Sequence, residues 1–294
     1  DDSGSITYVT AAYAGAVFNP TTDLNGIAFQ AVGSGTTVEN IQVHANVDDG
    51  VEFYGGAVNV KNVVLTDNGD DSFDTTGGWQ GNAQYVLITQ QAPGSDRAFE
   101  SDNNTTPNDA APLTNGQVAN VTIIRNSGDT SDVLKVRVGS AQGFSNMIVS
   151  ANSGTCFNID DGNGDGYLFA PLRSVLADCA VMTDKAQADT WIANNAGEVT
   201  SGGTFFNGYI NMGTTSVQPT DMNAVDSFFE TTTFIGAVEN CANDWVAGWT
   251  ISGTLPAVDT NICDSELVDT FNVPVMGWAG LVALFGGLAG IARM

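Results

Sequence analysis

Short strand-like segments recur along the first half of this 294-residue chain at a nearly constant spacing. Each segment runs or alternates apolar residues over five to eight positions and is bounded by Gly, Asn or Asp. Equivalent asparagines lie 22 residues apart from Asn40 to Asn62, and 26 apart from Asn120 to Asn146. A period in the low twenties that is built of short strands is typical of a solenoid. The five segments cover residues 38–45, 60–67, 83–90, 118–125 and 144–151.

An acidic turn recurs with the same period. It reads VDDGVEFYGG at residues 47–56 and GDDSFDTTGG at 69–78, and a second short strand overlaps each copy. Two or three strands in each coil of about 22–25 residues predict an all-β, right-handed parallel β-helix. Asp and Gly suit the corner between two strands, so turn structure is the first interpretation of the repeat and stacked carboxylates that bind Ca²⁺ are the alternative.

Three acids, Glu52, Asp74 and Glu100, occupy roughly equivalent places in successive coils. Their regular repetition favours a structural role, because active-site residues are usually unique. A second set of equivalent positions holds asparagine, with Tyr85 as a single substitution. Stacked amides that bond to one another stabilise stacked strands, so we predict a ladder at this bend. The ladder contains Asn40, Asn62, Asn120 and Asn146.

The formal charge of −25 makes nucleic acid an improbable partner and favours binding of divalent cations. The four cysteines form two sequence-local pairs, which predict the disulfides Cys156–Cys179 and Cys241–Cys263. Disulfides and high acidity indicate an extracellular or bacterial cell-surface protein. The chain starts at Asp1 without Met or an apolar leader, as we expect of a processed secreted protein.

Residues 31–88, 99–103 and 228–250 carry these motifs in a form that resembles a family of secreted bacterial parallel β-helix proteins of the surface or lipoprotein type. The resemblance covers roughly residues 5–155 and 205–250. It implies the fold but no activity, because the family has no catalytic signature to carry over. It also implies further coils upstream of this chain, removed or never present here.

One acidic loop, DDGNGDGYL at residues 160–168, has the first half of a calcium-binding pattern. Oxygens at alternate positions and a Gly-permitted turn can surround a hard cation. We therefore predict Asp161, Asn163, Asp165 and the Tyr167 carbonyl as calcium ligands. Leu172 stands where an EF-hand needs an acid, so the loop is no EF-hand.

Enzymatic interpretations have weaker support, and we expect no enzyme. Parallel β-helix polysaccharide lyases use Lys or Arg as the base, and Lys135 and Arg137 are two residues apart on one face of a strand. Two solvated charges that offset nearby acids are the favoured explanation of this pair. Trp245 and Trp249 are expected to cover the open end of the core, with sugar stacking as the alternative.

The last 22 residues, 273–294, are a break in composition, with 18 uncharged residues from Val275 to Ala292. We predict a solenoid over residues 1–255, with an irregular insert around 160–200, and a linker and apolar tail over 256–294. The VP dipeptide, the apolar stretch and the terminal Arg resemble sorting tails of the PEP-CTERM type, although the PEP core is missing. Small residues and one tryptophan mark its packing face: Trp278, Ala279, Ala283, Gly286, Gly287 and Gly290.

An apolar tail and an open first coil without a capping helix would both be covered by head-to-tail contact between copies. The sequence therefore predicts a structural protein that assembles with itself into a filament or surface layer, with calcium as a stiffening ion. The alternative is a membrane-tethered surface module that binds polysaccharide or cleaves it as a lyase.

Overall fold

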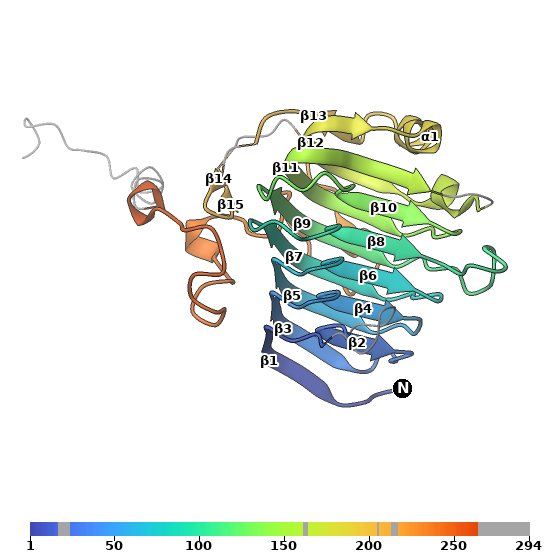
Figure 1. Ribbon diagram of the computed structural model, residues 1–294, viewed down its shortest axis with the longest axis horizontal. Coiled ribbons are helices and arrows are strands. Elements are labelled where there is room, and N and C mark those ends of the chain that lie inside the picture. The colour runs from blue at the N-terminus through green and yellow to red at the C-terminus, as the bar shows by residue number, and fades with distance from the viewer. Residues whose placement is uncertain (17–23, 161–163, 205, 213–216, 264–294) are drawn as a thin grey trace, which may run out of the picture. The chain divides into compact units, whose positions relative to one another are not determined.

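The computed structural model describes residues 1–16, 24–160, 164–204, 206–212 and 217–263. The chain divides into two compact units, Asp1–Val258 and Asp259–Met294, with the boundary three residues beyond the predicted one. In the first unit, thirteen strands of the described residues form a ladder of parallel neighbours, a β-solenoid of about seven turns (Figure 1). The predicted parallel β-helix is confirmed.

Two parallel sheets make up the ladder, and β11 (Gly143–Asp160) is long enough to belong to both. The first sheet also contains β1 (Ser5–Ala12), β3 (Thr37–His44), β5 (Asn59–Thr66), β7 (Asn82–Gln90), β9 (Gln117–Arg125), β12 (Leu172–Thr183) and β13 (Val199–Ser201). The second sheet also contains β2 (Ile27–Gln30), β4 (Val51–Tyr54), β6 (Phe73–Thr76), β8 (Phe99–Asp102) and β10 (Leu134–Arg137).

Like residues stack on like residues inside the coils. In the first sheet, Val63 pairs with Val86 and Val121 with Met147, and all four are fully buried. Facing them, phenylalanine rings from successive strands of the second sheet lie 4.9–5.1 Å apart between centroids. Strand alternation sends every second side chain into this core, and the side chains between them form the outer faces of both sheets.

Each strand of the first sheet except the short β13 bends at one equivalent position where the backbone is left-handed. We call these positions the bend column, and their φ angles lie between 51° and 61°. Asn tolerates this conformation better than other non-glycine residues, which explains why the sequence repeats it there. The column consists of Tyr8, Asn40, Asn62, Tyr85, Asn120, Asn146 and Ser174.

The amides of the bend column bond in two ways. Asn62 Nδ2 donates to Asn40 Oδ1 at 3.1 Å, as expected of a ladder. Asn120 instead donates to the backbone oxygens of Phe234 and Gly236, and Asn146 donates to that of Thr220. The later asparagines therefore hold a distant part of the chain rather than one another.

That distant part is a strap, residues 206–212 and 217–258, which includes β14 (Phe206–Asn207) and β15 (Ile210–Asn211). It lies on the outer face of the first sheet, where Val64 and Leu87 are buried together with Val246 of the strap. Trp245 and Trp249 also lie on the strap and donate to the carbonyls of Ala237 and Trp245. The expectation that these two residues cover the end of the core was wrong, because the outer face of the first sheet is itself apolar.

The helix α1 (Ala186–Asn194) covers the C-terminal end of the core (Figure 1). Trp191 is fully buried, contacts Phe144 and Phe157, and donates from Nε1 to Ala170 O at 2.8 Å. The segment around 160–200 was predicted to be irregular, but it adds the full strand β12 before this helix. The pattern was hidden because Ser174 replaces Asn at the bend.

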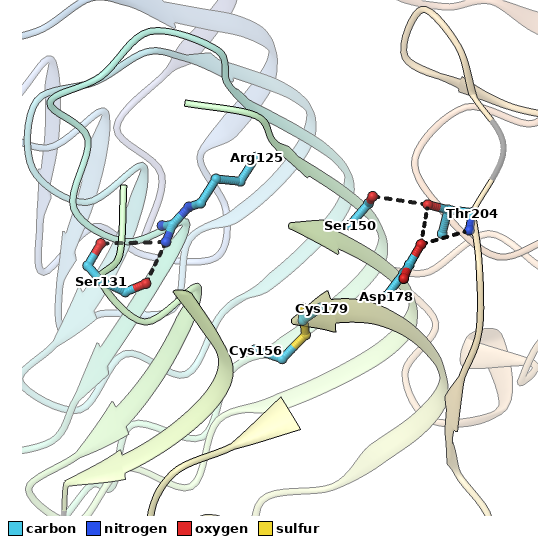
Figure 2. The surroundings of a disulfide bond; sticks show 7 residues. All are labelled: Arg125, Ser131, Ser150, Cys156, Asp178, Cys179 and Thr204. Atoms are coloured by element: carbon cyan, nitrogen blue, oxygen red, sulfur yellow. Dashed lines mark hydrogen bonds between the residues drawn. A yellow bond between two sulfur atoms is a disulfide. The ribbon is translucent and has the colours of Figure 1, made fainter. Parts of the chain in front are cut away.

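Both predicted disulfides are confirmed. Cys156 of β11 and Cys179 of β12 are joined with a Cα–Cα distance of 5.8 Å (Figure 2). Cys241 and Cys263 are disulfide-bonded too, and no cysteine in the described part of the chain is free. Beside the first bond, Asp178 Oδ2 accepts hydrogen bonds from the N–H and hydroxyl of Thr204.

The predicted assembly residues Trp278, Ala279, Ala283, Gly286, Gly287 and Gly290 lie outside the described residues. Within the described ranges, no helix combines the length and the hydropathy that a membrane crossing needs.

Candidate metal centre

The outer face of the second sheet carries a column of charged side chains. Glu52 of β4 is in register with Asp74 of β6, which is in register with Glu100 of β8 and then with Lys135 of β10. Their neighbours in each strand, including Phe73, point into the core, so alternation sends these four side chains outward. We call them the charged column.

The acidic turns that precede these strands have a structural role. Asp49 Oδ1 accepts a hydrogen bond from the backbone N–H of Asp71 at 3.0 Å, and Asp71 Oδ1 accepts one from Arg97 N–H at 2.8 Å. Each turn carboxylate therefore bonds to the backbone of the next coil. This contact between neighbouring coils explains why the acidic turn recurs in the sequence at the period of the solenoid.

The same geometry brings three carboxylates together. Asp49, Glu52 and Asp74 each offer one oxygen, and these oxygens lie within 4.8 Å of one another. The side chains of Asp49 and Glu52 are only 6 % and 7 % exposed. Carboxylate oxygens are the ligands that Ca²⁺ and Mg²⁺ prefer, so this donor set fits a hard divalent cation. We call the three residues the acid triad.

The electrostatics of the acid triad also fit a cation. Burial, followed by the charges of Asp71 and Glu52, raises the pKa of Asp49 to about 10. Burial and the charges of Asp49 and Glu52 raise the pKa of Asp74 well above its usual range. Among the described residues, no Lys or Arg nitrogen lies within ion-pair distance of these three carboxylates.

Cationic side chains instead gather at the other end of the charged column. Arg97 Nη1 lies 3.2 Å from Glu100 Oε1 and also pairs with Asp96. Arg137 Nη2 lies 2.5 Å from Glu100 Oε2, and its Nε donates to Asp102 Oδ1 at 2.7 Å. The face thus has an acidic half over β4 and β6 and a mixed half over β8 and β10.

Both guanidinium groups stay protonated. Burial lowers the pKa of Arg137, but the hydrogen bond to Asp102 and the charge of Glu100 raise it more, so that it lies above its ordinary value. For Arg97, burial is likewise outweighed by the charges of Asp71 and Glu100. A protonated guanidinium binds a carboxylate well and is a poor general base.

The predicted calcium loop, residues 160–168, shares no residue with the acid triad. Asp161 and Asn163 lie outside the described residues, so their role as ligands stays a prediction. Asp165 is exposed, and the Tyr167 carbonyl accepts a hydrogen bond from the N–H of Ala170. Asp165 belongs to none of the clusters of three or more His, Cys, Asp or Glu side chains in the described residues.

The residues of the charged column are recognisable in the sequence, but their pattern there predicts no binding site: the acids repeat regularly, and Lys135 is expected to be a surface charge. Lys135 and Arg137 do point away from the core, as expected, and Lys135 Nζ lies 3.4 Å from Asp160 Oδ2. Arg97 was missed, because a lone Arg after an Asp in a turn carries no pattern of its own. The signal that was available is the convergence of the turn acid Asp49 with the strand acids Glu52 and Asp74 at one corner.

Comparison with known proteins agrees with this architecture at the level of the family. No curated protein and no solved structure matches the chain. The family described as "Pectate-lyase like beta helix domain" matches residues 1–250, which is most of the chain and all thirteen strands of the solenoid. The chain therefore belongs to the family of pectate-lyase-like β-helix domains.

Proposed function

We propose that this chain is an extracellular β-helix module that binds an acidic polysaccharide through a divalent cation, Ca²⁺ by preference. The observation that carries the proposal is the acid triad, three buried or half-buried carboxylates with no cationic partner in the described structure, on the outer face of the second sheet. A cation bound by Asp49, Glu52 and Asp74 would supply positive charge to which the carboxylates of a polysaccharide could coordinate.

The mixed half of the same face supports this function. Arg137 is about one-third exposed, and Lys135 lies beside it on β10. A guanidinium can hold a second carboxylate of the same polymer with two parallel hydrogen bonds. Stacked strands lie about 4.8 Å apart, and only β8 separates β6 from β10, so the face suits a ligand that runs along the solenoid axis.

Binding is favoured over cleavage as a lyase. Abstraction of a proton next to a carboxylate needs a side chain that is deprotonated near the operating pH. The two guanidiniums keep their protons, and Lys135 is paired with Asp160. The family suggests the class of ligand, whereas these side chains favour recognition without chemistry.

The two disulfides support an extracellular location, since such bonds persist in oxidising compartments. The formal charge of −25 would repel an anionic polymer in the absence of a cation. Binding should therefore depend strongly on the divalent ion.

The test is affinity gel electrophoresis of the full chain through gels that contain polygalacturonate, with Ca²⁺ or with chelator. Retardation in Ca²⁺ is expected for the wild type and for the matched control Glu39→Gln, an exposed acid of β3 outside the triad. Chelator or Asp74→Asn should abolish it. If the wild type migrates alike with and without polymer, the proposed function is wrong. Retardation that survives both chelator and Asp74→Asn would exclude the role of the cation.

A second candidate, head-to-tail assembly into a filament, is favoured by the edge of β1. Within the described residues no strand pairs with the outer side of β1, and Tyr8 is 67 % exposed there. The other end of the core is covered by α1, so assembly would join this edge to the apolar tail.

Negative-stain electron microscopy of the full chain and of a chain that ends at Thr270 tests this candidate. Filaments that vanish on truncation would support it. Single particles from the full chain, or filaments indifferent to truncation, would contradict it.

A further inference from the structure

A groove lies away from the charged column, between the first sheet and the strap. It is a groove of about 280 Å³ whose walls include Lys61 of β5 and Tyr85 of β7, and Glu230, Glu239 and Trp245 of the strap. This volume is slightly below the range of about 300–1,000 Å³ that is typical of sites for drug-sized ligands. The groove therefore suits one small ring rather than a whole oligomer.

Tyr85 interrupts the run of asparagines in the bend column. It holds a left-handed backbone with φ 61°, which is costly for a bulky residue, between Asn62 and Asn120 in register. It also lacks the amide with which Asn62 bonds to Asn40. This coil therefore presents a phenol ring at the position where the coils before and after it present an amide.

Aromatic rings continue from Tyr85 in both directions. Its ring centroid lies 6.5 Å from that of Phe234 and 6.5 Å from that of Trp245. Trp245 stacks on Trp249 at 6.3 Å, and Trp249 meets Tyr8, the other tyrosine of the bend column, at 6.0 Å. All five rings are half-buried or exposed, so the row presents an aromatic surface to solvent.

Polar groups of both charges surround the central ring. Tyr85 Oη donates to Glu230 Oε2 at 3.0 Å, and Lys61 Nζ lies 2.9 Å from Glu230 Oε1. Glu239 Oε2 accepts from Asn243 Nδ2 at 2.6 Å. These groups are donors and acceptors held in place beside a flat apolar platform, and opposite charges next to one another disfavour a strongly charged ligand of either sign.

We infer that this groove binds a pyranose ring of a neutral polysaccharide, with the apolar face of the sugar on Tyr85 and Trp245 and its hydroxyls bonded to Glu230, Glu239 and Asn243. Neighbouring sugars would follow the row toward Trp249 and Tyr8. The inference rests on the proposed function only in that both concern polysaccharide. The two sites lie on different sheets and take ligands of different charge.

Tyr85→Asn is the decisive variant, because it places in the bend column the residue that the neighbouring coils use and should fold at least as well as the wild type. The probes are cellohexaose, laminarihexaose and mannohexaose, titrated by calorimetry onto the full chain. We expect the wild type to bind at least one of them and Tyr85→Asn to weaken that binding about tenfold or more, as loss of an aromatic anchor does. Phe169→Ala, an exposed aromatic outside the groove, should bind as the wild type does.

Two further sets of titrations distinguish a sugar-binding groove from the cation site and from a site for an amine. Asp74→Asn and chelator should leave hexaose binding unchanged, so failure of the cation-dependent function would not be mistaken for failure of the groove. Glu239→Gln, which keeps a hydrogen-bonding oxygen, should weaken hexaose binding only about threefold or less. The inference is overturned if none of the three hexaoses binds or if Tyr85→Asn binds as well as the wild type. Binding of choline in place of the hexaoses, lost in Glu239→Gln, would also overturn it in favour of an amine site.

Discussion

At Asp49, one carboxylate connects the repeat to the candidate site. Its Oδ1 accepts the N–H of Asp71 in the next coil, while the group faces Glu52 and Asp74 on the outer surface. A turn residue that only built the corner would not need two further acids beside it. Three converging carboxylates raise the free energy of the folded state unless they are protonated or neutralised by a cation.

The pH dependence of stability follows from this residue. Folded Asp49 keeps its proton up to a pKa of about 10, whereas the unfolded chain loses it near 3.8, so the folded state binds more protons between these values. Stability in chelator should therefore be greatest at acidic pH and fall as pH rises through this window, and the raised pKa of Asp74 acts in the same direction.

Asp49→Asn keeps an acceptor for Asp71 N–H and cannot ionise. Near pH 8 in chelator, its melting temperature should exceed that of the wild type by about 2–4 °C, which corresponds to about 1 kcal/mol for a chain of this size. Thermal melts followed by circular dichroism from about pH 5 to about pH 8 would measure this. A wild-type melting temperature that rises with pH in chelator would show that the triad is not strained by charge.

Asn120 makes the most bonds of the bend column. Its Nδ2 donates to Thr232, Phe234 and Gly236, and its Oδ1 accepts from Gln84. Asn120→Ala should cost about 2–4 kcal/mol of unfolding free energy, through buried partners left unsatisfied and through the left-handed backbone. Asn40→Ala, which loses one amide bond at a half-buried position, should cost about half as much in urea denaturation. Equal costs for the two variants would contradict a special role of Asn120 in holding the strap.

Among the elements, α1 is the one that covers the C-terminal end of the core. A stack of coils exposes its core and its strand edges at each end, and a helix removes that exposure by laying one apolar side chain across the last coil. Trp191 is that side chain, with its ring against Phe144 and Phe157.

Trp191→Ala should lower the free energy of unfolding by about 3–5 kcal/mol, because it opens a cavity at the end of the core and leaves Ala170 O without its donor. Phe169→Ala, at a residue that is 75 % exposed, should change it by no more than about 0.5 kcal/mol. Chemical denaturation of both variants is the measurement. A cost below about 1 kcal/mol for Trp191→Ala would mean that α1 does not close the core.

For the molecule as a whole, the local sequence pattern predicted the coils, but it did not predict the strap and the helix α1 that cover them. The period of the strands, the bend asparagines and the paired cysteines are all short-range signals, and each located its element. The contacts of the strap, such as Gln42 with Thr254, join residues more than 200 positions apart and leave no trace in a local window. For the same reason, α1 was hidden within a segment whose bend residue is Ser174 instead of Asn.

The candidate site shows the same division. Repetition of Glu52, Asp74 and Glu100 was visible, but repetition alone favoured structure. Only the fold shows that Asp49 joins two of them at one corner, and that Arg97 and Arg137 gather around the third. Which charged side chains come close together depends on how the coils stack, and the order of residues along the chain does not show that stacking.

Calorimetric titration of the full chain with Ca²⁺ near neutral pH, in two buffers of different ionisation enthalpy, tests the acid triad most directly. We expect binding of Ca²⁺ with release of protons, because Asp49 and Asp74 must ionise to bind it, so the observed heat should differ between the buffers. Asp74→Asn should lose this binding, and Glu39→Gln, an exposed acid on the first sheet, should keep it. Absence of Ca²⁺ binding by the wild type at millimolar concentrations, or binding unaffected by Asp74→Asn, would contradict a cation site on the second sheet.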